Sequence, residues 1–451
     1  MDILTLTPPI AALALAFATR NVVLSLLFGL ALSETLILKG HVLLAFPQIL
    51  DRVIGVLNSP GGAAIILFCL LVGALIALMR ESGGIAATVE RLISSGAAST
   101  PRRASLATAF AGVVLFIETN ISLLTSGILG RPLFDRLEMS RERLAYIIDS
   151  TCAPISVLIL VNGWGAYALG LVSPYVGDDA VRVVAGSIPL NFYALGTLVL
   201  VAFTAWTGRV FGPLQTVSSR GSISDADIKP TNAAYMLVPA VILVFGTLGF
   251  MLWTGGGDLF EGDGARSVLL AVSLAVTVLL LMLMGSKQFE RGQATNVAFA
   301  GIADLLPATT VILLALTLGG SLRELGTGDF IASMATAFPG AFAFPAIIFL
   351  AAAGTSFAVG TSWGTYGILI PVAMPLALGA DIPPSLMLAA VLGGGVFGDH
   401  ASPISDTTLI ASLSAGCDHI DHVRTQLPYA LVAAAAASVL YLIAGISAIG
   451  F

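Results

Sequence analysis

The residues of this chain best suited to chemistry lie at positions 398–408, which read Gly-Asp-His-Ala-Ser-Pro-Ile-Ser-Asp-Thr-Thr. They place two carboxylates, Asp399 and Asp406, among hydroxyl groups in a chain that is 57% hydrophobic and only 10% charged. Pro403 has no backbone N–H, so the carbonyl of Asp399, four residues earlier, loses its helical partner. Carboxylate, hydroxyl and carbonyl oxygens are the ligands that small hard cations prefer. We therefore expect this segment to bind a cation such as Na⁺.

Competition between a proton and a cation for one carboxylate gives exchange, and a partly dehydrated aspartate can bind either. We expect Asp399 to be this shared carboxylate and Asp406 to be a second ligand of the metal ion. Capping of a second half-helix by Asp406 or Ser405 is an alternative role that is compatible with the first. His400 either titrates near neutral pH or bonds a backbone group. The candidate ion- or substrate-binding residues here are Asp399, His400, Ser402, Ser405, Asp406 and Thr407.

A weaker version of the same pattern lies in the first half, at positions 149–156, which read Asp-Ser-Thr-Cys-Ala-Pro-Ile-Ser. Asp149 and Ser156 are candidate binding residues, although Asp149 lies close to an arginine-rich flank and would also serve as an entrance charge or a cap. Asn162 follows between apolar residues and glycines. It suits a helix break that contacts substrate, and the alternative is packing between helices through small residues.

Two apolar stretches carry polar residues at their centres, as re-entrant hairpins do. The first, 104–130, has arginines at both ends, which places both ends in the cytoplasm by the positive-inside rule. Its tip would be Glu118-Thr119-Asn120, with Glu118 and Asn120 as candidate binding residues. The second, 341–378, would have its tip near residues 360–365. Thr361, Ser362 and Thr365 could contribute hydroxyl groups there.

The composition places the chain in a membrane. A soluble domain has about 25% charged residues, whereas the mean hydropathy here is +0.98, and several apolar runs approach the roughly 20 residues that span a bilayer. The net charge is −6 without a basic cluster, so no nucleic-acid partner is expected. The three cysteines have no metal or disulfide spacing. The first apolar run lacks the features of a signal peptide and is expected to be a retained helix.

We predict an all-α polytopic membrane protein with about 10 transmembrane helices and two re-entrant hairpins in two inverted-topology repeats. Residues 1–208 form the first repeat, 209–232 a cytoplasmic linker and 233–451 the second repeat. Two long segments, 144–172 and 385–416, are predicted to be broken helices because each has a proline among small polar residues. The predicted spans are 3–19, 21–38, 61–79, 144–172, 188–208, 233–253, 267–286, 296–320, 385–416 and 429–450.

The lysines and arginines agree with this topology. Fourteen of the 20 fall in the loops assigned to the cytoplasm, which include 80–103 and 418–424, and five fall in the loops assigned to the outside, which include 39–60, 173–187 and 321–340. Inverted repeats with broken helices are typical of secondary transporters. No Walker A motif, catalytic triad spacing or metal motif is present, so we expect neither an enzyme nor an ATP-driven pump, and no cofactor beyond coupling ions. A channel is disfavoured because nothing indicates a subunit-symmetric filter.

These motifs resemble the NhaC family of sodium/proton antiporters, within the broader ion transporter superfamily. The similarity is carried by GDHASPISDTT at 398–408, SRERLAYIIDSTCAP at 140–154 and GTSWGT at 360–365, and it extends over most of the chain. The resemblance implies transport driven by ion gradients, two inverted repeats, an elevator-like motion and a homodimer. It also implies relatives that exchange small organic anions or move amino acids.

Two positions depart from the family pattern. An acidic pair is expected at the first hairpin tip, where this chain has Glu118-Thr119-Asn120. A run rich in Pro and Ser is expected where this chain has Leu158-Ile159-Leu160-Val161-Asn162-Gly163. Both changes put the ion stoichiometry in question. We therefore expect a secondary antiporter of the cell inner (cytoplasmic) membrane that exchanges Na⁺ for H⁺, with a Na⁺- or H⁺-coupled carrier of a small organic anion or amino acid as the alternative.

Overall fold

A computed structural model describes residues 3–19, 21–94, 99–114, 116, 119–159, 161–217, 230–286, 288–290, 292–338 and 340–449. No strand occurs among these residues, which confirms the all-α class. Glu118 and half of the predicted linker 209–232, residues 218–229, lie outside the described residues. The long helices are α1 (Thr7–Thr19), α2 (Val22–Ile37), α3 (Val42–Asn58), α4 (Pro60–Glu81), α5 (Gly84–Ser94), α6 (Pro101–Val114), α7 (Thr119–Arg136), α8 (Arg141–Leu158), α9 (Gly163–Val176), α10 (Ala180–Ser187), α11 (Phe192–Thr207), α12 (Ala234–Thr254), α13 (Gly264–Ser286), α14 (Gln293–Glu324), α15 (Thr327–Ala337), α16 (Phe344–Val359), α17 (Ser362–Gly379), α18 (Pro384–Ala401), α19 (Asp406–Ala415) and α20 (His419–Ile449).

Eight helices in the described part are long and apolar enough to cross a membrane, or nine if the bent pair α2 and α3 counts as one span. The count is below the ten predicted because the chain builds some of those segments from short pieces. The predicted span 3–19 contains α1, which has only 13 residues, and the predicted span 385–416 is divided into helices of 18 and 10 residues. The protein is a multi-pass membrane protein.

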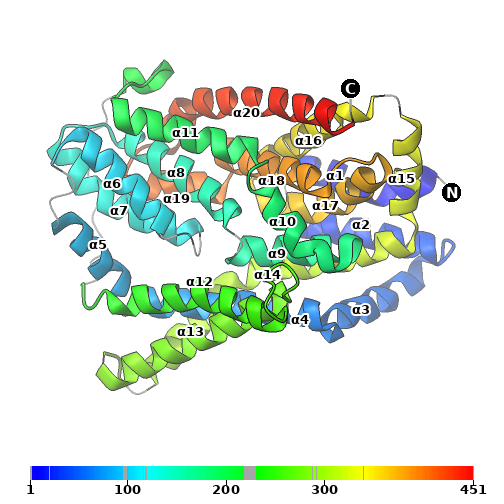
Figure 1. The fold of residues 1–451 in the computed structure, drawn as a ribbon, viewed down its shortest axis with the longest axis horizontal. Helices are drawn as coiled ribbons and strands as arrows, with labels where there is room; N and C mark the ends of the chain where they lie inside the picture. The colour runs from blue at the N-terminus through cyan, green and yellow to red at the C-terminus, as the bar shows by residue number, and fades with distance from the viewer. Residues whose placement is uncertain are drawn as a thin grey trace.

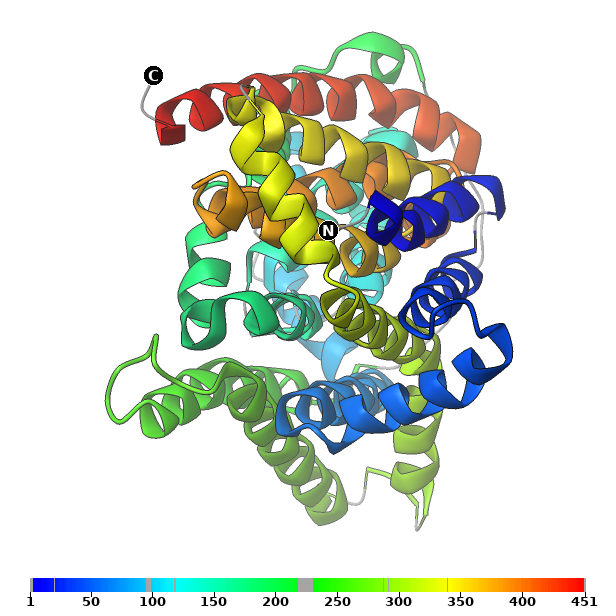
Figure 2. The ribbon, with the colours of Figure 1, turned by 90° about the vertical axis from the view of Figure 1, so that its right-hand side faces the viewer.

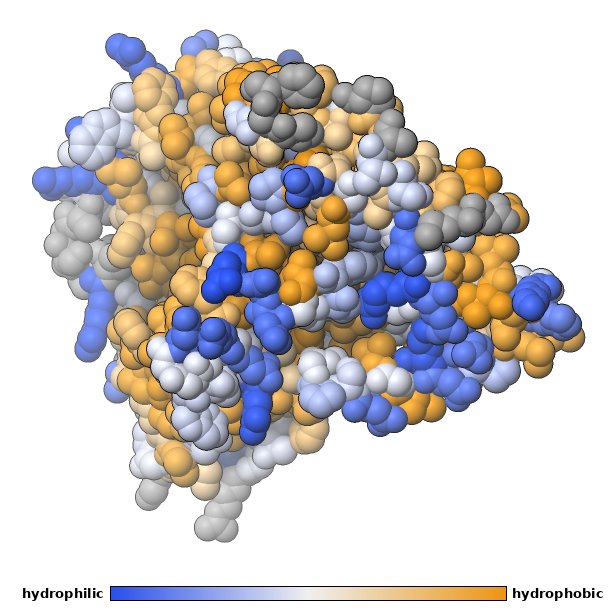
Figure 3. Space-filling model, turned by 45° about the vertical axis from the view of Figure 1, so that its right-hand side comes forward, coloured by the Kyte–Doolittle hydropathy of each residue, from blue (hydrophilic) through white to orange (hydrophobic). Residues whose placement is uncertain are grey.

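The surface agrees with a lipid environment. Large apolar side chains point outward along the long helices, as with Phe245 and Trp253 on α12 and Leu281 on α13, each more than half exposed. Figure 3 shows broad hydrophobic areas on one face, with the hydrophilic residues gathered in patches between them. In water such areas would be an aggregation hazard, whereas in a bilayer they are the expected contact surface.

Several segments predicted as loops are helical instead. The helices α3, α5, α10 and α15 lie within the predicted loops 39–60, 80–103, 173–187 and 321–340. The helix α20 begins at His419, so residues 418–424 are not a free loop. The buried side chain in this segment is the polar His422, which contacts Ser412 and Gln426, while Ile420 is exposed.

Both predicted hairpins are present as helix–turn–helix units. The first consists of α6 and α7, and the second of α16 and α17. The second turns at Gly360, which has a φ of +77°, and a Cβ at this position would lie 2.6 Å from the carbonyl oxygen of Ile404. Only glycine fits this turn without strain, and the turn brings the start of α17 against the break between α18 and α19.

Both predicted broken helices are also present, but the breaks differ in their relation to proline. In the second, α18 ends at Ala401, directly before Ser402 and Pro403. In the first, Pro154 lies within α8, and the helix ends four residues later at Leu158. A proline removes one hydrogen bond, and a helix can continue through it when its other turns are well packed; all the residues of α8 from Leu144 to Pro154 are buried.

Two groups of helices can be distinguished in Figures 1 and 2. The helices α4, α12 and α13 lie together at the lower edge of Figure 1, and the hairpins and broken helices lie above them. The helix α14 packs along α4. A Cβ on Gly73 of α4 would lie 2.4 Å from the carbonyl oxygen of Gly301 of α14, and the reverse distance would be 2.2 Å. The two backbones therefore touch at this crossing, as small residues allow in membrane helices.

Candidate functional site

The carboxylate of Asp399 is the centre of a compact group of hydroxyls. Its side chain is buried, with 4% of its surface exposed. Ser405 donates to Oδ1 over 2.6 Å, Thr407 donates to the same oxygen over 3.3 Å, and Ser362 donates to Oδ2. Ser405 and Thr407 also contact each other, at 2.9 Å. The predicted binding residues Ser362, Ser405 and Thr407 therefore all bond to Asp399, which was predicted as well.

The helix ends explain why these groups meet. Asp399 lies in the last turn of α18, Ser362 begins α17, and Ser405 immediately precedes α19. The N-termini of α17 and α19 carry partial positive charge, which favours an anionic group between them. Although Ser405 occupies the N-cap position of α19, its hydroxyl makes no capping bond there and is directed to Asp399 instead.

No positively charged side chain forms an ion pair with Asp399 in the described part of the chain. The same residues contain no group of three or more His, Cys, Asp or Glu that could hold a metal ion. Because a serine or threonine hydroxyl has two lone pairs as well as a proton, it can donate to a carboxylate or accept from a cation. The donor set therefore fits a small alkali cation with mixed hydroxyl and carboxylate ligands, and not a transition metal.

The carbonyl of Asp399, which Pro403 leaves without a helical partner, does find one. The hydroxyl of Thr408 donates to it over 3.1 Å and to the neighbouring carbonyl of His400 over 3.4 Å. The sequence predicts that this carbonyl lacks a hydrogen-bond donor. In the structure the hydroxyl of Thr408 donates to one of its two lone pairs. Thr408 was not among the predicted residues, although it is the last member of the motif.

Asp406 lies at the edge of this group. Its side chain is exposed at the first position of α19, and its Oδ1 accepts the backbone N–H of Thr407 over 3.0 Å. The side chain of Asn120, near the first hairpin tip, is within hydrogen-bonding reach of it. Asn120 also lines a cavity of about 130 Å³ together with Arg80 and Asp304. Asn120 therefore lies between Asp406, at the edge of the Asp399 site, and a small cavity bounded by the first hairpin, α4 and α14.

Three other predicted residues, Ser402, Thr365 and Ser156, bond away from Asp399. The hydroxyl of Ser402 donates to the carbonyl of Phe357 over 2.7 Å and ties the break to the second hairpin. The hydroxyl of Thr365 donates to the carbonyl of Thr361 over 3.1 Å, one turn back in its own helix. Ser156 likewise donates to the carbonyl of Cys152 over 2.8 Å. Thr361 is half-buried at the N-cap of α17, without a capping bond from its side chain.

Asn162 organises the first break. Its Oδ1 accepts the backbone N–H groups of Trp164 (3.0 Å) and Gly165 (3.1 Å), so it caps α9. Its Nδ2 donates to the carbonyls of Ser156 (2.7 Å) and Phe116 (3.2 Å). A primary amide has two donor hydrogens and two acceptor lone pairs. All four are engaged here, and the residue joins α8, α9 and the first hairpin.

An aromatic cluster, which the sequence did not single out, connects the first broken helix with the second hairpin. The rings of Trp164 and Trp363 lie 4.2 Å apart, and those of Tyr167 and Trp363 are stacked at 5.2 Å. The indole N–H of Trp164 donates to Thr119 over 3.2 Å, and the hydroxyl of Tyr167 donates to the carbonyl of Trp363 over 3.0 Å. The cluster therefore connects both hairpin tips with α9.

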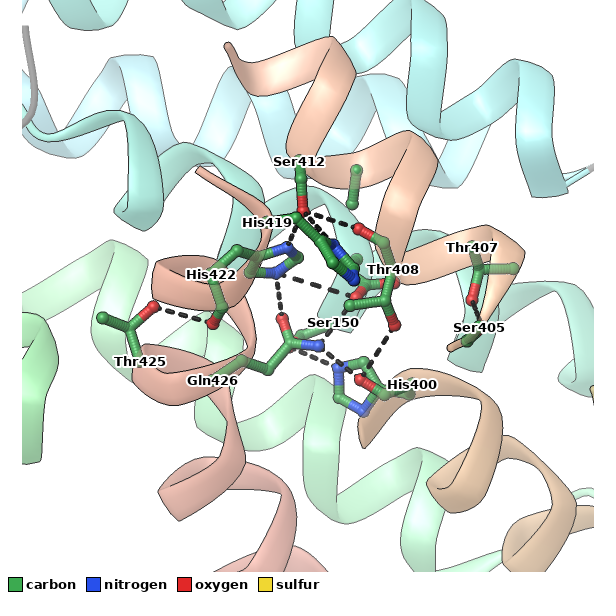
Figure 4. A network of polar contacts seen from close by, with 12 residues as sticks. Ser150, His400, Ser405, Thr407, Thr408, Ser412, His419, His422, Thr425 and Gln426 are labelled. Carbon is green, nitrogen blue, oxygen red and sulfur yellow. Dashed lines mark hydrogen bonds and ion pairs between the residues drawn. The ribbon is translucent and has the colours of Figure 1, made fainter. Parts of the chain in front are cut away.

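His400 points away from the Asp399 group and into a second polar network, shown in Figure 4. Its ring is fully buried between two hydroxyls, Ser150 at 2.8 Å from Nε2 and Tyr193 at 2.7 Å from Nδ1. Asp149 belongs to the same network and accepts a hydrogen bond of 2.7 Å from Gln426. Gln426 and the buried His422 were not predicted, because the sequence indicated that residues 418–424 are solvated.

Two arginines hold the C-terminal end of α19. Arg131 donates to the carbonyls of Ser414 (2.5 Å) and Leu413, and Arg141 donates to that of Ala415 over 3.1 Å. The positive charges face the end of a helix dipole that favours them. These contacts attach the arginine-rich end of the first hairpin and of α8 to the second broken helix.

The chain is similar to known proteins in both sequence and fold. A model described as the Na⁺/H⁺ antiporter family matches residues 155–446. An uncharacterized protein of Haemophilus influenzae is 32% identical over 98% of this chain and 90% of its own length. The malate-2H⁺/Na⁺-lactate antiporter of Bacillus subtilis is 38% identical over a shorter region, 20% of this chain and 19% of that protein. The crystal structure of the YdaH transporter of Alcanivorax borkumensis has a similar fold, with a TM-score of 0.60 at 15% identity over 90% of this chain and 88% of that one.

Proposed function

Because the chain belongs to the Na⁺/H⁺ antiporter family, we propose that it exchanges Na⁺ for H⁺ across the cytoplasmic membrane, with the Asp399 carboxylate binding each in turn. Family and fold make it a secondary transporter. The shared carboxylate is the specific part of the proposal. It is supported chiefly by one observation, namely that Asp399 is buried among neutral donors, the hydroxyls and the backbone N–H of Ser362, with no cationic partner in the described residues.

An unpaired carboxylate in a low-dielectric site is unfavourable unless it binds a proton or a cation. Hydroxyl donors from Ser362, Ser405 and Thr407 reduce this penalty but bring no positive charge. The carboxylate must therefore be neutralised by something mobile. A proton and a sodium ion both do this, and each excludes the other from the same oxygens.

The hydroxyls permit both states without a change of fold. With no cation present, Ser405 and Thr407 donate to the carboxylate, as the distances indicate. When Na⁺ occupies the site, the same hydroxyls turn their lone pairs toward it and donate elsewhere. Asp406 would then be a second, outer ligand, and Asn120 and Glu118 would close the site from the first hairpin, while Thr361, Ser362 and Thr365 would close it from the second.

Alternating access is proposed to follow from two repeats, 1–208 and 233–451, joined by the linker 209–232. The order of elements supports this division, because a long helix, a hairpin, a broken helix and a further helix occur twice, as α4 to α11 and as α14 to α20. The close crossing of α4 and α14 at Gly73 and Gly301 suggests a fixed frame. We propose that the hairpins and broken helices move against this frame in an elevator-like motion.

A second candidate function is exchange of a small organic anion, coupled to Na⁺ and H⁺. The similarity to the malate-2H⁺/Na⁺-lactate antiporter over one fifth of the chain favours it. The Trp164–Trp363 pair beside the hairpin tips would provide an apolar wall for such a solute. Radiolabelled malate and lactate distinguish the two functions, because a Na⁺/H⁺ exchanger moves protons in their absence.

The experiment is a sodium pulse applied to proteoliposomes that contain a trapped pH indicator, with wild type and Asp399→Asn compared. Asparagine keeps the size of the side chain but cannot hold a proton and a sodium ion alternately. Proton movement should fall by about 100-fold or more, to the level of empty liposomes. Sodium-driven proton movement in Asp399→Asn at the wild-type rate would remove Asp399 from the mechanism. Sodium-dependent malate or lactate exchange by a wild type that moves no protons alone would favour the second function.

A further inference from the structure

Asp149 is a fully buried carboxylate that takes no part in the hydroxyl group around Asp399. Its Oδ2 accepts the side-chain amide of Gln426 over 2.7 Å, and its Oδ1 has no hydrogen-bond partner in the described part of the chain. Thr408 lies close to it, but that hydroxyl donates to the carbonyls of Asp399 and His400. A buried carboxylate with an open oxygen is the kind of group that accepts a proton.

A chain of polar groups leads from Asp149 toward the surface. The Nε2 of His422 lies 3.7 Å from Oδ2 of Asp149, and both side chains are fully buried. The Nδ1 of His422 lies 2.9 Å from the hydroxyl of Ser412, which in turn lies 3.1 Å from Nδ1 of His419. His419 is half-exposed in the first turn of α20. Figure 4 shows the two imidazoles on either side of Ser412, with Gln426 below them.

The hydrogen bonds fix the orientation of Gln426. Its nitrogen faces two groups that can only accept, the Asp149 carboxylate and the carbonyl of His400 at 2.5 Å. The nitrogen must therefore be the donor, and the amide oxygen must face Nε2 of His422 at 2.8 Å. Since an amide oxygen only accepts, Nε2 of His422 carries a proton. Gln426 is thus a positioning residue that aligns this N–H beside the carboxylate.

The two histidines face the same hydroxyl group. The Nε2 of His419 lies 2.7 Å from the carbonyl of Pro403, so it must also be an N–H. The hydroxyl of Ser412 donates to the carbonyl of Thr408 over 2.8 Å, so neither bare Nδ1 receives its hydrogen when both imidazoles are neutral. An extra proton on one imidazole gives an Nδ1–H that donates to a lone pair of Ser412. The hydroxyl hydrogen reaches the other imidazole when the hydroxyl turns from the carbonyl of Thr408 toward that Nδ1.

We propose that His419, Ser412 and His422 form a proton path from the surface to Asp149, separate from the cation site at Asp399. This inference rests on the proposed Na⁺/H⁺ exchange and names the route of its proton. A proton enters at His419; its Nδ1–H passes to Ser412 as the hydroxyl hydrogen passes to Nδ1 of His422. The Nε2–H bond of His422 then breaks, and an O–H bond forms at Asp149. The imidazole is then the Nδ1–H tautomer, and rotation of the ring with tautomer exchange restores the Nε2–H form before the next proton arrives.

The path opens on the arginine-rich face of the protein. The end of α19, directly before His419, is the end held by Arg131 and Arg141. The positive-inside rule assigns this face to the cytoplasm. We propose that the cation site is reached past Asp406 and Asn120, on a different side of the protein, where Asn120 lines the cavity beside α4 and α14. Protons and sodium ions therefore have separate entrances on this model of transport.

Other ionisable groups surround the path and would respond to its charge. Asp399 and Asp406, from α18 and α19, interact electrostatically with Asp149. His400 of α18 lies near His422, and Tyr193 of α11 lies near both Asp149 and His400. The electrostatic interaction between Asp149 and Asp399 gives the coupling a physical form. A proton on Asp149 removes a negative charge beside the cation site, and so weakens the attraction for Na⁺ at Asp399. Sodium bound at Asp399 in turn favours loss of the proton from Asp149.

The test compares two fluxes in proteoliposomes of the full-length protein: proton movement driven by a sodium gradient, and self-exchange of radioactive sodium, which needs no net proton transfer. His422→Gln keeps a polar side chain in the network but cannot relay a proton, and Ser412→Ala removes the central hydroxyl. Both should reduce proton movement on the order of 100-fold and leave sodium self-exchange within about twofold of wild type. His41→Gln, an exposed histidine at the start of α3, is the matched control and should change neither flux.

Each outcome has a distinct meaning. Proton movement at the wild-type rate in both His422→Gln and Ser412→Ala would overturn the path and leave the antiporter proposal standing. Equal loss of both fluxes in folded protein would assign these residues a structural role, and so would also overturn the path. Wild-type protein that exchanges sodium but moves no protons would overturn the antiporter proposal and the path together.

Discussion

Both broken helices place a polar side chain where the helix is interrupted, but the two side chains differ in how fully the protein satisfies them. At the first break, the side chain between the half-helices is the neutral amide of Asn162, whose donors and acceptors are all engaged by the protein itself. At the second, it is the carboxylate of Asp399, whose partners in the described part of the chain are neutral and include three hydroxyls that can turn toward a cation. The amide at the first break has all its hydrogen bonds satisfied within the protein. The carboxylate at the second break can still bind an ion.

The difference teaches that a helix break in a membrane protein is not in itself a binding site. Both breaks expose backbone groups at helix ends. What distinguishes them is whether the nearby side chains satisfy those groups completely. Where the hydrogen bonds are complete, the break stabilises the fold. Where a charge is left with neutral partners, it can bind an ion.

Asn162→Ala is expected to have the largest effect on stability. The change removes a helix cap and leaves the carbonyls of Ser156 and Phe116 without a donor, at a cost of about 3 kcal/mol. Thermal unfolding in detergent should therefore begin well below the wild-type temperature. Asp399→Asn, which removes a buried charge, should unfold at the wild-type temperature or above it. The reverse order would show that the first break is the more tolerant of the two.

Ser405→Ala is expected to have the next largest effect, on sodium affinity. A hydrogen bond to a charged group contributes about 1.5 kcal/mol, so the sodium concentration that gives half-maximal exchange should rise by about tenfold. Ser405→Thr keeps the hydroxyl and should recover most of the affinity. Ser156→Ala is the matched change at the first break, where the hydroxyl bonds only the carbonyl of Cys152. A comparable loss of affinity there would remove the distinction between the breaks.

The smallest effect is expected from the prolines. Pro403→Ala supplies an N–H that competes with Thr408 for the carbonyl of Asp399 and favours continuation of α18. Sodium affinity should fall by roughly fivefold. Pro154→Ala lies within α8, which already continues past this position, and should leave affinity within about twofold of wild type. Dose–response curves for sodium on both variants measure this, and equal responses would contradict the assignment of the ion to the second break.

The sequence predicted those parts of the fold that are determined by residues close together in the chain. Arginines on both sides of 104–130 indicated the first hairpin, and Asp399 with Pro403 indicated the second broken helix and its site. The helices in the predicted loops were missed because their apolar faces are matched to neighbours that the sequence does not specify. The break expected from Pro154 does not occur there, since a proline lowers helical stability by an amount that the buried surroundings of α8 offset. The break lies instead at Asn162, the other position that the sequence marked as suited to one.

The proton path could not have been predicted from local sequence. His422 and Gln426 are four residues apart on α20 and therefore share a face, a weak signal by itself. Their burial depends on α20 packing against the preceding helix α19 and against α8, which is distant in sequence. The contact of Thr408 is a similar case, because the sequence does not show to which carbonyl a threonine hydroxyl near a proline will donate its hydrogen bond.

The close indoles of Trp164 and Trp363 have an optical consequence. The chain has four tryptophans, and the other two, Trp206 and Trp253, are more than half exposed on the outer surface. The close pair, tilted by 33°, joins one element from each half of the chain at the hairpin tips, so any relative displacement of these elements changes the electronic coupling between the two rings. The protein thus carries its own chromophore pair at the junction proposed to move, and its near-ultraviolet circular dichroism should shift with sodium concentration without an added label.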